Sequence, residues 1–183
     1  MKKLIAIALF LLPTTAFSLE TVPRSPTVSD GSGWVTPDNA FTSNDVYATG
    51  ITASQQKYST FTFTLTSTTT IVNGIKIIVE GAGLGANSPL NLDLSYNAGT
   101  NWSSTKSNTI LNGADANYTY GSSTDTWGRT WVYSDFSDPN FRVRLTNGGA
   151  NAINVDNFTV TVYSQIFDSI IQTGIQTVGI QTK

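Results

Sequence analysis

The amino-acid sequence predicts an all-β protein, an antiparallel β-sandwich with jelly-roll topology, followed by a short C-terminal tail. Three observations lead to this fold class. Apolar and polar residues alternate with a period of two in several segments, the segments are separated by Gly, Asn and Asp, and residues 34–164 show no helical period of 3.6. Short strands with such turns are typical of sandwiches and barrels. A jelly roll is favoured because a long last strand can pair centrally with early strands.

The alternation predicts four clear strands, at residues 60–66, 75–79, 90–94 and 141–145. In residues 153–162 the apolar positions change from odd to even at Asp156-Asn157, which predicts a β-bulge inside a fifth, final strand. Asn73-Gly74 marks a further turn or bulge. Weaker strands are expected at residues 46–48, 106–111, 118–120 and 130–133.

The N-terminus has the three parts of a secretory signal peptide. Lys2 and Lys3 form a basic head, residues 4–12 form an apolar run, and Ala16 and Ser18 supply small residues for cleavage after Ser18. The alternative is a membrane anchor, but a spanning helix needs about 20 apolar residues. The protein is therefore expected to be secreted or displayed on a cell surface, and the compact basic head is typical of bacteria.

Four parts of the chain are expected. They are a signal peptide at residues 1–18, an extended leader with two prolines at 19–33, the β-sandwich at 34–164 and a low-complexity tail at 165–183. No second apolar stretch is long enough to span a bilayer, so the mature chain is expected to have no membrane span.

The composition argues against most catalytic chemistry. The chain has no cysteine and no histidine, so it has no thiolate nucleophile and lacks the commonest general base and transition-metal ligand. Its 10 basic and 12 acidic residues give a net charge of −2 and no basic patch for nucleic acid. The protein is expected not to be an enzyme, and a small hydrolase is the third and last functional alternative.

An aromatic segment, residues 118–131, is the candidate ligand site. Flat rings flanked by polar side chains can stack on a sugar and bind its hydroxyl groups. The candidate residues are Tyr118, Tyr120, Asp125, Trp127, Arg129 and Trp131. The alternative is that Trp127 and Trp131 close the end of the sandwich, and Trp34 is expected to seal another edge of the core.

Ser95-Tyr96-Asn97-Ala98-Gly99-Thr100-Asn101-Trp102 resembles the Asp-box of sialidases and other secreted β proteins, Ser-x-Asp-x-Gly-x-x-Trp. The resemblance implies a hairpin turn in which the third side chain caps the turn, the Gly takes a positive φ and the Trp packs back over the hairpin. Asn97 replaces the acidic residue and can accept the same hydrogen bonds. The single degenerate copy implies a structural role and no sialidase activity.

Val155-Asp156-Asn157-Phe158-Thr159-Val160 resembles the closing strand of jelly-roll carbohydrate-binding modules, in some of which the Asp ligates a structural calcium ion. No cofactor is expected, and calcium is the one ion that the resemblance suggests. Its candidate ligands are Asp156 and, from the N-terminal part of the chain, Asp45. Asp30, Asp38 and Asn39 are further sources of oxygen in the N-terminal part of the chain. Calcium needs six to eight oxygen ligands.

The tail carries apolar residues at steps of three and four, among them Ile166, Phe167, Ile170 and Ile171. It is either a frayed amphipathic end or a site for a protein partner or self-assembly. The leading hypothesis for the whole chain is a non-catalytic exported surface, structural or adhesion module, because the sequence texture resembles modules of bacterial cell surfaces and phage virions. The alternative is a carbohydrate-binding module with an aromatic platform, stabilised by calcium.

Overall fold

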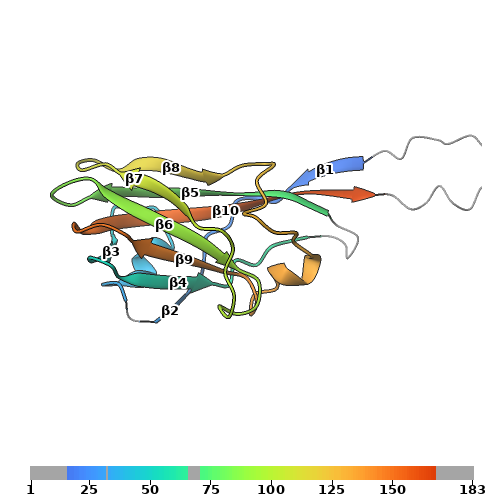
Figure 1. Ribbon diagram of the computed structural model, residues 1–183, viewed down its shortest axis with the longest axis horizontal. Coiled ribbons are helices and arrows are strands. Elements are labelled where there is room, and N and C mark those ends of the chain that lie inside the picture. Colours follow the sequence, from blue (N-terminus) through green and yellow to red (C-terminus); the bar gives the residue numbers. More distant parts are fainter. Residues whose placement is uncertain (1–15, 32, 66–70, 168–183) are drawn as a thin grey trace, which may run out of the picture.

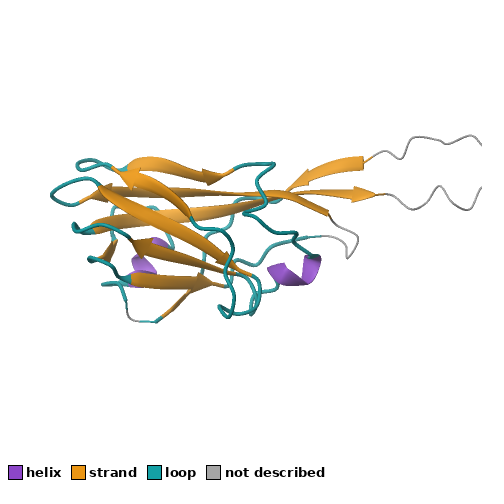
Figure 2. Ribbon diagram, in the orientation of Figure 1, coloured by secondary structure: helices purple, strands orange, loops and turns teal. Residues whose placement is uncertain are grey.

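The computed structural model describes residues 16–31, 33–65 and 71–167, which form ten strands in two antiparallel sheets (Figures 1 and 2). The first sheet has the order β1-β10-β5-β8, and β3 also pairs with β10; the second has the order β2-β4-β9-β6-β7. The strands of the first sheet are β1 (Ala16–Glu20), β3 (Ala48–Gly50), β5 (Ile71–Gly83), β8 (Ala116–Gly121) and β10 (Ile153–Phe167). Those of the second are β2 (Val28–Asp30), β4 (Gln55–Ser59), β6 (Ser88–Ser95), β7 (Lys106–Ile110) and β9 (Arg142–Asn147).

The strand order is that of a jelly roll. From β3 onward, one sheet reads β3-β10-β5-β8 and the other β4-β9-β6-β7, so that the chain passes between the sheets at every connection except the β6–β7 hairpin. β10 pairs with β5 on one side and with β3 and β1 on the other. The expectation that the long last strand pairs centrally with early strands is confirmed.

The core lies between the two sheets and is built by the alternation that the sequence shows. Leu90, Leu92 and Leu94 of β6 are fully buried and face the first sheet, whose Ile75, Ile77 and Val79 are equally buried. Burying one such side chain stabilises the fold by about 1.5–3 kcal/mol relative to leaving it exposed. Trp34 is also buried, as expected for a residue that seals the core.

Two predicted bulges are present. The pairing of β10 with β5 shifts between Val155 and Asn157, where the sequence changes parity. A second shift opposite Tyr163 and Ser164 leaves Asn73 unpaired beside Gly74. Each bulge adds a residue to one strand only, so the side chains on both sides of it can still face the core.

Two predicted strands are absent from the structure, and other strands were not predicted. Residues 60–65 keep the alternating burial but form no strand, because Thr60 and Thr62 have φ angles of 60° and 50° that interrupt the extended backbone. Residues 130–133 were expected to form a strand, and a short 3₁₀ helix, η2 (Tyr133–Phe136), begins there instead. The sequence analysis missed β1 and β2, which pair with β10 and β4 although residues 19–33 were expected to form a leader outside the sandwich. It also missed β4, whose inward positions include the fully buried Gln56, a residue that the apolar pattern does not reveal.

The sandwich has two distinct ends, because β10 runs along its whole length (Figure 1). The loop pole consists of four connections at the start of β10, residues 51–54, 84–87, 111–115 and 148–152, together with residues 41–47 that lead into β3. The terminal pole consists of β1 and the end of β10, which form a two-stranded ribbon that projects from the sandwich. Both ends of the described chain therefore leave at the terminal pole.

Candidate functional site

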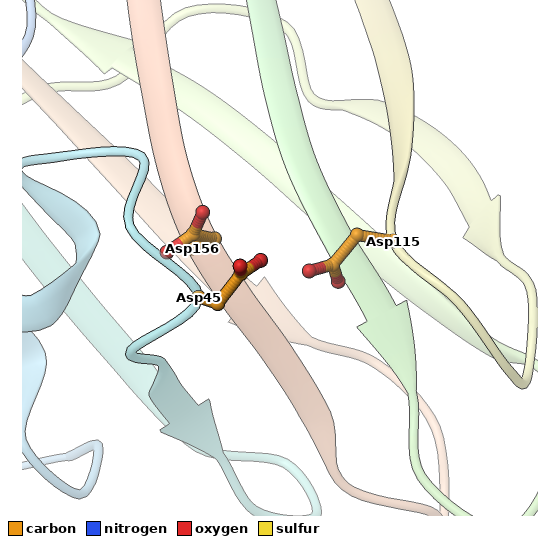
Figure 3. Close-up of side chains that lie close together, drawn as sticks. All are labelled: Asp45, Asp115 and Asp156. Carbon is orange, nitrogen blue, oxygen red and sulfur yellow. The ribbon is translucent and has the colours of Figure 1, made fainter.

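Three carboxylates come together at the loop pole (Figure 3). Asp45 lies just before β3, Asp115 just before β8 and Asp156 near the start of β10, so three separate segments contribute one residue each. Oxygen atoms of the three side chains lie within 4.8 Å of one another. Asp156 is buried, Asp115 is half-buried and Asp45 is exposed, and the group therefore spans from the sheet to the surface.

Local backbone and side-chain contacts hold this carboxylate trio in place. Both carboxylate oxygens of Asp156 accept a hydrogen bond from the backbone N–H of Asn44, at 3.2 and 3.0 Å. The next residue, Asp45, has a left-handed φ of 61°, which turns the chain beside Asp156. On the other side of the trio, the Tyr47 hydroxyl donates a 2.8 Å hydrogen bond to Oδ2 of Asp115.

The trio lacks a compensating positive charge among the described residues, because none of their ion pairs involves Asp45, Asp115 or Asp156. Oδ1 of Asp115 is buried and has no hydrogen-bond partner in the described chain. The pKa of Tyr47 is raised to about 12, first by its hydrogen bond to Asp115, then by desolvation and by the charges of the three carboxylates. A hard cation between the three carboxylates would relieve the repulsion of their negative charges. Carboxylate oxygens are the ligands that calcium prefers.

The structure brings together the two predicted ligands, Asp45 and Asp156, and adds Asp115. The other candidates are engaged elsewhere: Asp30 forms an ion pair with Arg142, Asp38 accepts a hydrogen bond from the Ser29 hydroxyl, and Asn39 donates to the Tyr47 carbonyl. Asp115 could not be identified as a ligand from the sequence, because it lies in a Gly/Asp/Asn-rich turn like several others. It is brought to Asp156 only by the pairing of β8 with β5 and of β5 with β10.

The aromatic candidates of residues 118–131 lie mostly in the core. Trp127 is fully buried, and Tyr120 and Trp131 are each 2% exposed. The Trp127 indole donates to the Ile75 carbonyl at 2.9 Å, and the Trp131 indole donates to the Thr126 carbonyl at 2.8 Å. This placement corrects the interpretation of these rings as an exposed sugar platform. The alternative, that Trp127 and Trp131 close the sandwich, describes their positions.

The three remaining candidates of this segment are occupied by internal contacts. The Tyr118 hydroxyl accepts a hydrogen bond from the Leu111 N–H at 2.9 Å. Asp125 pairs with Lys106 at 2.6 Å, and the Arg129 guanidinium lies 3.5 Å from the centre of the Tyr96 ring while it pairs with Asp135. These contacts stabilise the end of the sandwich, and they leave no predicted member of the segment free for a ligand.

A hollow of about 200 Å³ lies next to this segment, and the sequence analysis did not anticipate it. Its lining combines apolar and polar side chains, among them Phe63, Leu65, Tyr133, Ser134, Phe136 and Asp138. Tyr133 is 40% exposed, so its ring is accessible at the rim. Asp138 uses Oδ1 to accept a hydrogen bond from the Thr62 N–H at 2.9 Å. The only sign of this site in the sequence is the aromatic and polar composition of residues 131–138.

The turn at Ser95–Trp102 has the geometry expected of a capped hairpin. Asn97 Oδ1 accepts a 2.8 Å hydrogen bond from the Asn101 N–H, Gly99 has a φ of 86°, and Ser95 forms an antiparallel bridge with Trp102. The ring of Trp102 is half-buried and lies 4.2 Å from the Arg144 guanidinium. The segment therefore has a structural role in connecting β6 with β7.

The predicted partner-binding residues lie at or beyond the end of β10. The backbones of Ile166 and Phe167 pair with Phe17 and Ala16 of β1. Ile170 and Ile171 lie outside the described residues. No helix within the described ranges is long and apolar enough to cross a membrane.

No protein-family model and no curated protein sequence matches the chain. Among solved structures, the CBM22-1 xylan-binding domain of Xyn10C from Paenibacillus barcinonensis is similar, with a TM-score of 0.34 and 10% sequence identity. The alignment covers 77% of this chain and 92% of that domain. A likeness of this size assigns the chain to no family, so the function must be argued from its own residues.

Proposed function

We propose that the chain is an exported, non-catalytic β-sandwich module that presents its loop pole to a binding partner. The observation that carries the proposal is the separation of the two poles. The chain leaves the sandwich at the terminal pole, so attachment through either end directs the loop pole away from the point of attachment. Connections at the end of a rigid sandwich are also where such folds commonly place binding residues.

The surface of the loop pole supports this role. Ile51, Leu84, Leu111 and Val46 belong to four different segments of this pole, and each is about half exposed. Single exposed apolar residues are ordinary, but four on one end of a small domain favour a contact surface. The surface includes Asp45 of the carboxylate trio, which would add polar specificity to an apolar contact.

The state of the other carboxylates supports a non-catalytic role. Asp30, Asp93, Asp125 and Asp135 each form an ion pair with an arginine or a lysine, so each is engaged in a structural contact inside the domain. A glycosidase needs one carboxyl group that holds a proton until it reaches the leaving group. The pairing, together with the lack of histidine and cysteine, disfavours general acid catalysis and nucleophilic catalysis at these positions.

A calcium ion bound by the carboxylate trio is part of the proposal. The ion would join residues 41–47, the loop before β8 and the start of β10, and would supply the missing partner of Asp115 Oδ1. Backbone carbonyls and water would complete the coordination shell. The role proposed for the ion is to hold the loop pole rigid, so that its contact surface is preformed.

Calorimetry tests the calcium site. Calcium at 100 times its dissociation constant should stabilise the wild-type protein by about 2.7 kcal/mol and raise its Tm. Asp115→Asn and Asp156→Asn should lose this increase, whereas Asp38→Asn, which removes an exposed carboxylate elsewhere, should keep it. A wild-type Tm that does not change between calcium and a chelator would contradict the site.

Adhesion measurements test the presenting surface. The protein would be attached to beads through a C-terminal tag, which leaves the loop pole free. The beads would be added to cell envelopes of the exporting cells and, for comparison, to other surfaces, and the bound beads would be counted. The triple substitution Ile51→Ser, Leu84→Ser and Leu111→Ser should reduce binding by about tenfold, the effect of losing about 1.4 kcal/mol. Val22→Ser and Val132→Ser, at exposed apolar residues away from the loop pole, are the matched control. Equal loss in both proteins would overturn the proposal.

Glycan binding is a second candidate, favoured by the hollow beside Tyr133. An exposed ring next to hydroxyl and carboxylate groups is suited to a sugar. The volume is below the roughly 300–1,000 Å³ of ordinary ligand pockets, which favours a single sugar residue. A glycan array with wild-type protein and with Tyr133→Ala tests this function, with Val132→Ala as the control. Binding that persists in Tyr133→Ala would exclude the hollow.

A further inference from the structure

The outer edge of β10 is covered along its length by residues from the start of the chain. Val160 exchanges two backbone hydrogen bonds with Arg24, and the Val162 carbonyl accepts one from the Thr21 N–H. Further along, β1 takes over this edge, with Leu19 opposite Ser164 and Phe17 opposite Ile166. Because alternate residues of a strand turn their N–H and C=O to the same side, Ile166 presents its backbone groups to this edge, as Val160 and Val162 do.

The predicted signal-peptide cleavage would remove part of this cover. A cut after Ser18 leaves Leu19 and Glu20 in place but removes the residues opposite Gln165, Ile166 and Phe167. On the inner side, the described pairing of β10 with β5 ends at Gln165 opposite Ile71. In the mature chain, the backbone groups of Ile166 would therefore lose their partner, and an open strand edge of this kind is a template for another strand.

The sequence immediately after β10 carries a pattern suited to that edge. Residues 171–177 read Ile-Gln-Thr-Gly-Ile-Gln-Thr, with β-branched residues at every odd position and Gln or Gly between them. This period of two is typical of a strand. A tail that folded back on its own β10 would reach Leu19 after pairing with only three residues, 165–167. A tail from another molecule has no such limit, because it can continue past Phe167.

We infer that cleavage before Leu19 opens the edge of β10 at Ile166, and that residues 165–177 of a second copy of this chain pair with it antiparallel. The pairing is reciprocal and gives a two-fold dimer through β-strand addition. This inference rests on the export part of the proposed function, since the cut creates the open edge. Processing of the chain would thus control assembly, and the two loop poles would face away from each other.

Sedimentation velocity on proteins produced directly, without export, tests the inference. Leu19–Lys183 should dimerise as its concentration rises. Ala16–Lys183, which keeps the whole of β1, should dimerise at least about tenfold more weakly. Leu19–Lys183 with Ile166→Pro should also be weakened, because proline removes the N–H that the added strand needs. The double substitution Gln172→Pro and Gln176→Pro, at donor positions of the same parity as Ile166, should weaken dimerisation in the same way, and thermal unfolding checks that each protein is folded.

Two results would overturn the inference: a monomeric Leu19–Lys183 at all concentrations, or equal dimerisation of Ala16–Lys183. The proposed export is tested separately by measuring the mass of the protein that cells secrete from the full-length gene. A secreted product starting at Leu19 together with a monomeric Leu19–Lys183 would reject the dimer and keep the export. A product with an intact N-terminus would reject the cleavage trigger, whatever the sedimentation result.

Discussion

The Tyr47 hydroxyl and Asp115 Oδ2 are joined by a 2.8 Å hydrogen bond that links the segment before β3 to the loop before β8. The two segments are far apart in sequence and lead into different strands of one sheet. Their contact places a phenol beside three carboxylates, and it makes Tyr47 a reporter of the charge at the loop pole.

Replacing Asp115 by Asn should lower the pKa of Tyr47 from about 12 toward 10, because the hydrogen bond to the charged carboxylate is the largest cause of the increase. NMR titration of the Tyr47 ring measures the change. Asp138→Asn, at the hollow beside Tyr133, should leave this pKa where it is. Calcium should also lower it, since a nearby cation favours the tyrosinate. An unchanged value in Asp115→Asn would contradict the electrostatic account of the site.

Alkaline pH should destabilise the fold through two buried tyrosines. Burial raises the pKa of Tyr58 and of Tyr120 above the ordinary value of 10, so in the folded state both stay protonated where the unfolded chain ionises. The contribution of the two protonated tyrosines to the free energy of unfolding is complete below pH 10, and it is lost as the pH rises above 10. Each should lower the free energy of unfolding by about 1.4 kcal/mol per pH unit in that range. Urea unfolding at pH 8 to 11.5 tests this, and Tyr58→Phe should show a shallower decline.

Trp127→Ala should destabilise the protein by about 3–5 kcal/mol, since it empties a fully buried site and leaves the Ile75 carbonyl without its donor. Trp102→Ala is the matched control, because that ring is only half-buried on the outside of the second sheet, beside Arg144. Its cost should be clearly smaller. Urea unfolding followed by circular dichroism gives both values, and similar losses would argue against the core position of Trp127.

Asn97→Ala should cost about 1 kcal/mol, because the Asn101 N–H loses the side-chain acceptor that caps the turn. Asn97→Asp keeps an acceptor at the same place and should be close to neutral. Comparison of the two Tm values decides between a capping role and mere surface exposure. A destabilised Asn97→Asp with an unaffected Asn97→Ala would be the reverse of the expected order.

The sequence predicted the strands best where one face is apolar and the other polar. β6 and β9 alternate without interruption, and even the bulge at Asp156-Asn157 could be read from a change of parity. The alternating pattern failed to predict a strand where a buried side chain is polar. Gln56 of β4 is fully buried and donates to the Asp30 carbonyl, so this strand lacks the apolar signal although its position is as interior as that of Val143.

The site was predicted only in part, because its residues meet through tertiary structure. Asp156 could be named as a ligand from the resemblance of the last strand, and Asp45 as an oxygen source in the N-terminal part of the chain. Asp115 could be added only from the register that pairs β8 with β5 and β5 with β10. The prediction of a sugar site in the aromatic segment, residues 118–131, was wrong for a related reason. A tryptophan in a polar stretch is suited equally to a sugar site and to closing a core, and only the burial of Trp127 separates the two.

The position of both ends at the terminal pole has a mechanical consequence. A force that pulls β1 and the end of β10 apart would separate the ribbon one hydrogen bond at a time, so it would yield under a small load. A force between the end of β10 and the loop pole acts along the strand instead, and it loads the β10–β5 ladder and the contacts with β3 together in shear. The fold is therefore expected to withstand tension between a tethered C-terminus and a partner held by the loops.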